Sequence, residues 1–99
     1  MVTLKSPAEI GALLAQRVRE QRLQRGWSQA ELARRAGLKL PTYVLFERTG
    51  RVSLLRFIAV LEVLGLSGEI EQLGALSLPA GASLAELARP LPQRGRTRR

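Results

Sequence analysis

The fold is decided by residues 28–50, which read SQAELARRAGLKLPTYVLFERTG. Ser28 is followed three residues later by Glu31, a spacing typical of a capping box at the start of a helix. Gly37 is the residue type that most often ends a helix in the left-handed conformation. The stretch therefore predicts a short helix between Ser28 and Gly37.

A second short helix is expected directly after the first. Because a proline disfavours helical geometry at the residue before it, Leu40 is the expected N-cap and Pro41 the first helical residue. This helix is expected to reach about residue 48, before Gly50. Two short helices joined by a few residues form the helix-turn-helix layout, whose second helix enters the major groove of DNA.

The residues where the two helices meet fit this layout. Ala33 is small where the helices cross, and Gly37 turns the chain. Together with the capping box, five apolar residues at the right spacing to line the inside support the layout: Leu32, Ala36, Leu38, Tyr43 and Phe46.

Three further helices are expected around this motif, and no strand pattern is present. They are predicted over residues 7–25, 54–64 and about 68–73, each opened by a capping serine: Ser6, Ser53 and Ser67. The chain is therefore predicted to be all-α, with five helices in a domain over residues 1–78.

Residues 79–99 are predicted to form a linker, a short helical turn opened by Ser83 and an arginine-rich tail. The prolines, glycine and five arginines of residues 89–99 cannot bury enough apolar surface to order the tail alone. The tail is either a contact to DNA or to a partner protein, or a solubilising extension. The arginines expected to make such contacts are Arg94, Arg96, Arg98 and Arg99.

The composition excludes several classes of protein. The 99 residues include no cysteine, histidine, aspartate or asparagine. A disulfide scaffold, a thiolate zinc site and most nucleophilic triads are therefore excluded, and we expect no enzyme activity, cofactor or metal. No apolar stretch approaches the roughly 20 residues of a membrane span, and no signal peptide is visible. We therefore expect a soluble cytoplasmic protein.

The charge is high and unevenly placed. The net charge is +8, with 11 basic and 4 acidic residues in positions 1–56. Positions 57–88 hold four acidic residues and no basic one, and positions 89–99 hold five arginines. Basic surfaces of this kind usually face nucleic acid, the alternative being a solubilising surface combined with a codon bias toward arginine.

The sequence resembles the Cro/phage-repressor (XRE) family of helix-turn-helix proteins. The similar segments are RVREQRLQRGWSQAELARRAG at 17–37, FERTG at 46–50 and the helix over 53–66, within a region of about residues 10–73. The resemblance implies a lambda-repressor-like DNA-binding domain, usually a homodimer, that represses transcription. The turn at 47–51, the leucine-rich fourth helix and the arginine tail look most like antitoxins paired with HipA-type kinase toxins. That resemblance implies a cognate toxin and repression of the chain's own operon.

The resemblance also assigns candidate contacts to the DNA backbone. Gln29 matches a glutamine that touches the backbone, and the free N–H groups of residues 28–30, from Ser28 on, form a physical phosphate site of their own. Lys39 and Arg51 lie at the two ends of the third helix, where they suit phosphates. Arg22 and Glu47 match an ion pair between the first and third helices, the alternative being a solvated surface pair.

The expected base-reading positions depart from the family pattern. They are normally Arg, Gln, Asn or Ser, because these side chains match the donors and acceptors on base edges. Here the helix offers Leu40, Pro41, Val44 and Leu45, and only Thr42 can form a hydrogen bond. Such a helix can pack against thymine methyl groups but cannot make a bidentate contact to guanine.

Two functions therefore stay open from the sequence. The first is a dimeric DNA-binding repressor that reads sequence through a few apolar contacts, DNA shape or the arginine tail. The alternative is a protein-binding module on a degenerate helix-turn-helix scaffold, whose apolar third helix docks on a partner protein.

Homodimerisation is predicted from the apolar residues near the C-terminal end of the domain. A domain of this size cannot cover all of them by itself, and the segment lacks positive charge. The residues expected to be exposed in some combination are Phe57, Val60, Val63, Leu66, Ile70, Leu73, Leu76 and Leu78.

Overall fold

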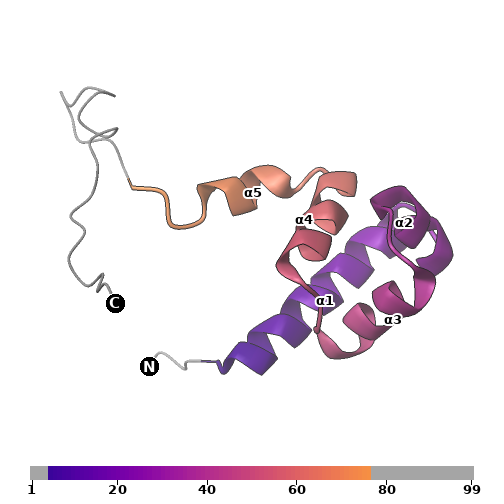
Figure 1. Ribbon diagram of the computed structural model, residues 1–99, viewed down its shortest axis with the longest axis horizontal. Helices are drawn as coiled ribbons and strands as arrows, with labels where there is room; N and C mark the ends of the chain where they lie inside the picture. The colour runs from indigo at the N-terminus through magenta and orange to yellow at the C-terminus, as the bar shows by residue number, and fades with distance from the viewer. Residues whose placement is uncertain (1–4, 77–99) are drawn as a thin grey trace, which may run out of the picture.

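The computed structural model describes residues 5–76, which form five helices (Figure 1). The prediction of an all-α, five-helix domain is confirmed, and no strand occurs among the described residues. The predicted turn at Ser83, the four tail arginines and Leu78 lie outside these residues. In chain order the helices are α1 (Pro7–Gln24), α2 (Gln29–Ala36), α3 (Leu40–Thr49), α4 (Leu54–Val63) and α5 (Ser67–Gln72).

The start of α1 is fixed by its capping box. The Ser6 hydroxyl accepts a hydrogen bond from the Glu9 N–H at 3.1 Å, and the Glu9 carboxylate accepts one from the Ser6 N–H at 2.8 Å. Both predicted halves of this box are therefore present. The helix ends one residue earlier than expected, with Arg25 as its C-cap.

The predicted capping box of α2 is only half correct. The Ser28 hydroxyl accepts from the Glu31 N–H at 3.0 Å. The Glu31 carboxylate does not return to the Ser28 backbone, because it accepts hydrogen bonds from Arg34 and Arg35 on the next turn. Two guanidinium groups compete here with one backbone N–H for the same carboxylate, and charge-assisted bonds are the stronger ones.

The predicted first residues of α3 and α5 are shifted by one position. Lys39, not Leu40, is the N-cap of α3, because proline is tolerated throughout the first turn, where its missing N–H has no partner to lose. Ser67 is the first residue of α5 and not its cap, and Leu66 takes the cap position without a side-chain hydrogen bond. The Leu66 N–H donates a hydrogen bond of 2.8 Å to the Leu61 carbonyl, and with Leu66 held in this turn α5 begins at Ser67, one residue before the predicted start.

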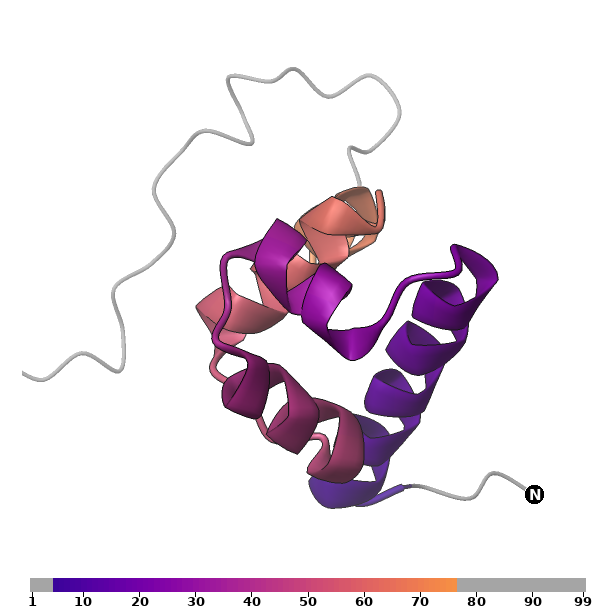
Figure 2. The same cartoon turned by 90° about the vertical axis from the view of Figure 1, so that its right-hand side faces the viewer.

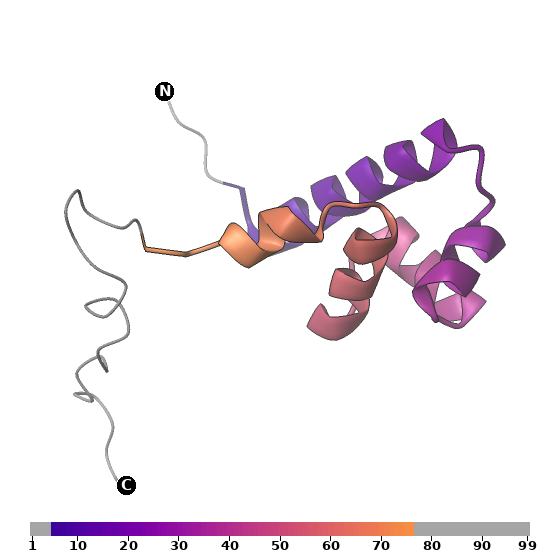
Figure 3. The same cartoon turned by 90° about the horizontal axis from the view of Figure 1, so that it is seen from above.

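Each helix packs against one or two of the others. α1 packs against α3, α2 packs against both α3 and α4, and α5 contacts α4. Figure 1 shows α2 and α3 on one side of α4 and α5 on the other. In the view from above, α2 and α3 gather at the end of the domain where α1 finishes, and α5 lies toward the opposite end (Figure 3).

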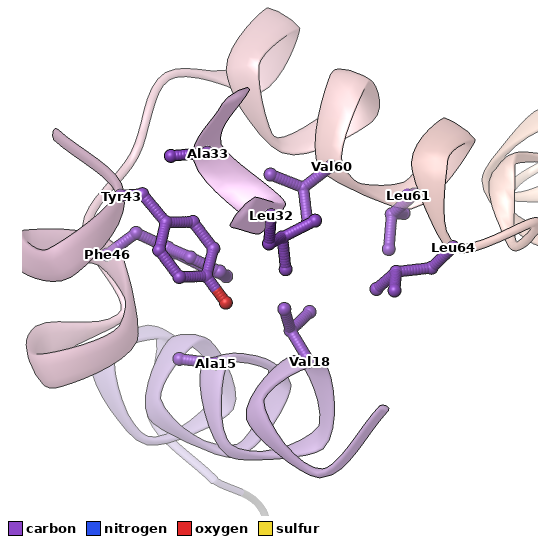
Figure 4. Close-up of a cluster of buried hydrophobic side chains, with 9 residues drawn as sticks. All are labelled: Ala15, Val18, Leu32, Ala33, Tyr43, Phe46, Val60, Leu61 and Leu64. Carbon is purple, nitrogen blue, oxygen red and sulfur yellow. The ribbon is translucent and has the colours of Figure 1, made fainter. Parts of the chain in front are cut away.

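The core lies between α1, α2, α3 and α4 (Figure 4). Its largest fully buried side chains are Leu32, Tyr43, Phe46 and Val60. The burial of Val60 removes it from the apolar residues available for a dimer contact. Around these four lie Ala15, Val18, Ala33, Leu61 and Leu64, while Ala36 and Leu38 are half-buried against the cluster.

A close approach of two glycines joins α1 to the end of α3. Gly50 has a φ of +81°, in the left-handed region that favours glycine. A Cβ atom at Gly50 would lie 2.5 Å from the carbonyl carbon of Gly11. Only glycine therefore fits at position 50 while α1 and α3 keep this packing.

None of the described helices is both long enough and apolar enough to cross a membrane.

Candidate nucleic-acid interface

α2 and α3 form one face of the molecule, seen directly in Figure 2. The turn between them is set by Gly37, with a φ of +71°, and by a hydrogen bond of 2.8 Å from the Leu38 N–H to the Ala33 carbonyl. This geometry is the helix-turn-helix arrangement. We use the name α2–α3 face for the sequence-predicted contact residues on these helices and beside them: Ser28, Gln29, Lys39, Leu40, Pro41, Thr42, Val44, Leu45 and Arg51.

A buried ion pair lies behind this face. Arg22 donates from Nε and Nη2 to the two carboxylate oxygens of Glu47, each at 2.9 Å. The side chains of Arg22 and Glu47 are only 8% and 4% exposed, so this is a buried pair and not a solvated one. A third guanidinium nitrogen, Nη1, donates to the carbonyl of Trp27 at 2.8 Å. One arginine of α1 therefore holds both the end of α3 and the residue before the cap of α2.

Two more side chains complete the network around Glu47. The Tyr43 hydroxyl donates to its Oε2, and the Gln29 amide donates to its Oε1 at 3.0 Å. Burial raises the pKa of Glu47, but the hydrogen bonds from Arg22, Tyr43 and Gln29 outweigh burial and hold the pKa of this carboxyl below its ordinary value. Burial and the adjacent Glu47 carboxylate raise the pKa of Tyr43, so its hydroxyl remains the donor.

Gln29 is therefore tied to the interior by its amide group. Its side chain is half-buried, and one amide N–H is directed at Glu47. A contact from Gln29 to the DNA backbone would therefore be made by its backbone N–H or by the part of its side-chain amide that is not bonded to Glu47. Neither the Tyr43 bond nor the Gln29 bond was expected from the sequence. The spacing of Tyr43 and Glu47, four residues apart in one helix, was an available signal.

The outward surface of α3 is mainly apolar. Leu40 is 43% exposed and Leu45 is 42% exposed, and Pro41 is exposed beside them. Thr42 and Val44 are half-buried. The residues expected to read bases therefore all lie on α3, and its two leucines are the most exposed large apolar side chains among them.

Positive charge stands at both ends of this apolar surface. Lys39 precedes α3 and Arg51 follows it, and both are exposed. Arg48, in the last turn of α3, is exposed as well and was not singled out from the sequence. One cation therefore lies at the amino end of α3 and two lie at its carboxyl end.

The arginines of α2 are engaged within the protein. Arg34 and Arg35 form ion pairs with Glu31 at 2.6 Å and 2.7 Å. The Arg35 guanidinium also lies over the Trp27 ring, 4.3 Å from its centre. Hydrogen bonds from Arg34 and Arg35 hold the pKa of Glu31 below its ordinary value, so this carboxylate stays ionised. Both acidic residues of α2 and α3 are therefore paired with arginine.

The described residues contain no cluster of acidic, histidine or cysteine side chains that could hold a metal ion. The chemistry of the α2–α3 face is that of a docking surface with cationic ends.

Comparison with known families identifies this arrangement. A family model described as helix-turn-helix (HTH_3), of the Cro/phage-repressor (XRE) type, matches residues 18–70. The match covers more than half of the chain, from the middle of α1 into α5. A comparison with curated proteins returned no match. Domains of this helix-turn-helix family bind DNA in transcriptional regulation and are typically not enzymes. The chain belongs to this family of helix-turn-helix DNA-binding domains.

Proposed function

We propose that the chain is a transcriptional repressor that binds double-stranded DNA as a homodimer, with α3 in the major groove. The observation that carries the proposal is the charge of the segment that forms α2, α3 and the residues between and just after them. Residues 29–51 hold five basic and two acidic residues, and both acids, Glu31 and Glu47, are paired with arginines. DNA phosphates approaching this face therefore meet cations at its ends and no unpaired carboxylate.

Three features of this face suit phosphate groups. Lys39 and Arg51 are 12 positions apart in the chain, one at each end of α3, and suit phosphates on the two sides of the groove. The amino end of α2, after Ser28, presents backbone N–H groups that have no partner within the helix. The network of Arg22, Glu47 and Gln29 holds this helix end in place against α3.

The dimer contact is proposed at α4, α5 and the residues after them. Residues 54–73 hold one basic and three acidic residues, so this surface repels DNA and suits a subunit contact. A groove of about 440 Å³ lies between α1, α4 and α5, lined by Phe57, Leu66 and Ile70 among others. Four leucines on α4 and from the end of α5 onward are strongly exposed: Leu54, Leu55, Leu73 and Leu76, at 65%, 78%, 79% and 74%. In such a dimer the two copies of α3 should lie about 34 Å apart, one turn of DNA.

The test first selects a duplex that the full chain binds from a random pool. The full chain is then titrated into the labelled duplex, and binding is measured by fluorescence anisotropy. We expect saturation at two chains per duplex and an affinity that falls steeply as salt rises. Lys39→Ala should weaken binding to every duplex alike. Arg17→Ala is the matched control for charge, because Arg17 is exposed on α1, away from the α2–α3 face. Arg17 also lines the groove proposed for the dimer contact, so sedimentation must first show that this variant keeps the same mass as the unmodified chain.

The protein-binding alternative is favoured by one observation, the exposure of Leu40 and Leu45. It predicts no salt-sensitive DNA binding, together with a partner protein whose binding is abolished by Leu45→Ala. The same titration therefore separates the two functions.

A narrower form of the proposal is that the repressor is an antitoxin. It is supported by the resemblance of residues 47–51, the leucine-rich α4 and the arginine tail to antitoxins paired with HipA-type toxins. If so, the chain should co-purify with a kinase-like protein encoded by a neighbouring gene and repress the operon that contains both genes. If the arginine tail contacts DNA, removing residues 89–99 should lower DNA affinity and reduce its dependence on salt. If the tail serves the toxin, the truncated chain should bind DNA normally and lose only toxin binding. Identical behaviour of the two chains in both assays would leave the tail a solubilising extension.

A further inference from the structure

Three polar side chains on and beside α3, those of Thr49, Tyr43 and Gln29, are already engaged inside the protein. The Thr49 hydroxyl donates to the Leu45 carbonyl at 2.7 Å and accepts from the Arg51 N–H at 3.1 Å. The Tyr43 hydroxyl and the Gln29 amide both donate to Glu47. The first two turns of α3, which contact bases in a helix-turn-helix domain, are left with few groups that can form hydrogen bonds to a base edge.

What these turns present outward is hydrocarbon. Leu40 and Leu45 are the most exposed large apolar side chains on α3, with Pro41 beside them. Thr42 is half-buried, and Arg48 lies in the last turn, at the end of the helix nearest to Arg51. We assign Arg48 to the phosphates, because the base contacts of this motif come from the start of the helix.

The major groove offers such a surface one kind of complementary group. Among the four ordinary bases, only thymine carries an apolar group there, the methyl on C5. 5-Methylcytosine carries the same methyl at the same atom. The two bases differ at C4, where thymine has an acceptor oxygen and cytosine a donor amine. A leucine side chain has no donor or acceptor with which to detect this difference.

We propose that α3 recognises 5-methylpyrimidines as a class, with Leu40 and Leu45 as the specificity-determining residues. Thymine supplies the methyl groups in unmodified DNA, and 5-methylcytosine supplies them where cytosine is methylated. Binding to a given site should then respond to cytosine methylation. This inference rests on the proposed DNA-binding function and specifies what its recognition helix reads.

The test begins with a duplex selected from a random pool by the full chain. Each thymine is replaced singly by uracil, which removes the methyl and keeps the base pairing. At positions under α3 we expect affinity to fall about four-fold per methyl, the factor for one buried methyl group. Replacing the same T·A pair by 5-methyl-C·G should retain the affinity, and replacing it by C·G should lower the affinity by about the same four-fold factor.

Protein variants show which side chains are responsible. Leu45→Ala and Leu40→Ala should each become insensitive to uracil at one position, and both residues are exposed, so the thermal midpoint should stay close to that of the unmodified chain. Lys39→Ala is the control, because it should weaken all duplexes and keep the full response to uracil.

Three results would overturn the inference or its foundation. If the selected duplex binds with salt-dependent affinity but uracil has no effect, methyl reading is wrong and the DNA-binding function stands. If uracil weakens binding but 5-methylcytosine cannot replace thymine, the face detects the C4 group and the class is wrong. If no duplex binds at all, the proposed function itself fails.

Discussion

Replacing Glu47 by glutamine removes one charge from the network that joins α1, α2 and α3. The Arg22 side chain is 8% exposed and depends on this carboxylate for two of its three hydrogen bonds. Glutamine has nearly the same shape but leaves the guanidinium without a counter-charge. Breaking a buried pair in this way typically destabilises a protein by about 3–5 kcal/mol.

The assay is urea unfolding followed by the fluorescence of Trp27, the only tryptophan, at one fixed protein concentration. The urea curves should show a loss of about 3 kcal/mol in the free energy of unfolding, and a thermal melt of the same variant should show a Tm lower by at least about 12 °C for a domain of this size. Glu31→Gln is the matched control, because it breaks an ion pair to exposed arginines and should have a much smaller effect. Replacing Arg22 and Glu47 together by Met and Leu should recover part of the loss, because no buried charge is then left unpaired.

The explanation based on the buried charge would be refuted if Glu47→Gln destabilised the domain no more than Glu31→Gln. It would also be refuted if the double replacement were as unstable as Glu47→Gln alone.

Three further predictions follow from the packing and charge of the domain. Gly50→Ala should lower the free energy of unfolding by more than about 2 kcal/mol in urea unfolding, because the new Cβ would clash with the backbone of Gly11. Gly37→Ala is the control, because Gly37 has a similar positive φ but open space around it; it should lower the free energy of unfolding by only about 1–2 kcal/mol, the cost of the left-handed conformation. Because the pKa of Glu47 is lower in the folded chain than in the unfolded chain, the ionised carboxylate should stabilise the fold at pH values above the unfolded pKa of about 4.3. This stabilisation should be lost as the pH falls through the folded pKa, so the unfolding curves of Glu47→Gln and of the unmodified chain should converge in acid. If the proposed dimer forms through α4 and α5, Leu73→Glu should convert it to a monomer in sedimentation experiments without changing helix content by circular dichroism, and an unchanged mass would place the subunit contact elsewhere.

Features encoded by neighbouring residues were predictable from the sequence. The capping box of α1 needs only Ser6 and Glu9, and the stop of α2 needs only Gly37, so local reasoning identified both. The Ser67 cap was wrong, because the turn after Gly65 includes a bond from Leu66 back to Leu61 that competes with local capping. Local patterns are overridden where the chain folds back on itself.

Features that depend on distant segments were beyond the sequence. α4 is apolar on nearly all sides, so its periodicity could not show that Val60 faces the core while Leu54 and Leu55 are exposed. The hydrogen bond from Gln29 to Glu47 joins residues 18 positions apart, and no local spacing indicates it. The close approach of Gly11 and Gly50 likewise exists only once α1 and α3 are packed.

The central claim, that the α2–α3 face binds the DNA backbone, is tested most directly by the salt dependence of DNA affinity. The measurement compares the unmodified chain, the double variant Lys39→Ala/Arg51→Ala and the control Arg17→Ala on one duplex over a series of salt concentrations. Each lost phosphate contact lowers the slope of log affinity against log salt by about 0.9. Because the proposed dimer carries two copies of each residue, the double variant removes four contacts and should lose roughly 3.6, while the control keeps the full slope. A double variant with the same slope as Arg17→Ala, or an unmodified chain whose DNA affinity does not change with salt, would contradict the claim.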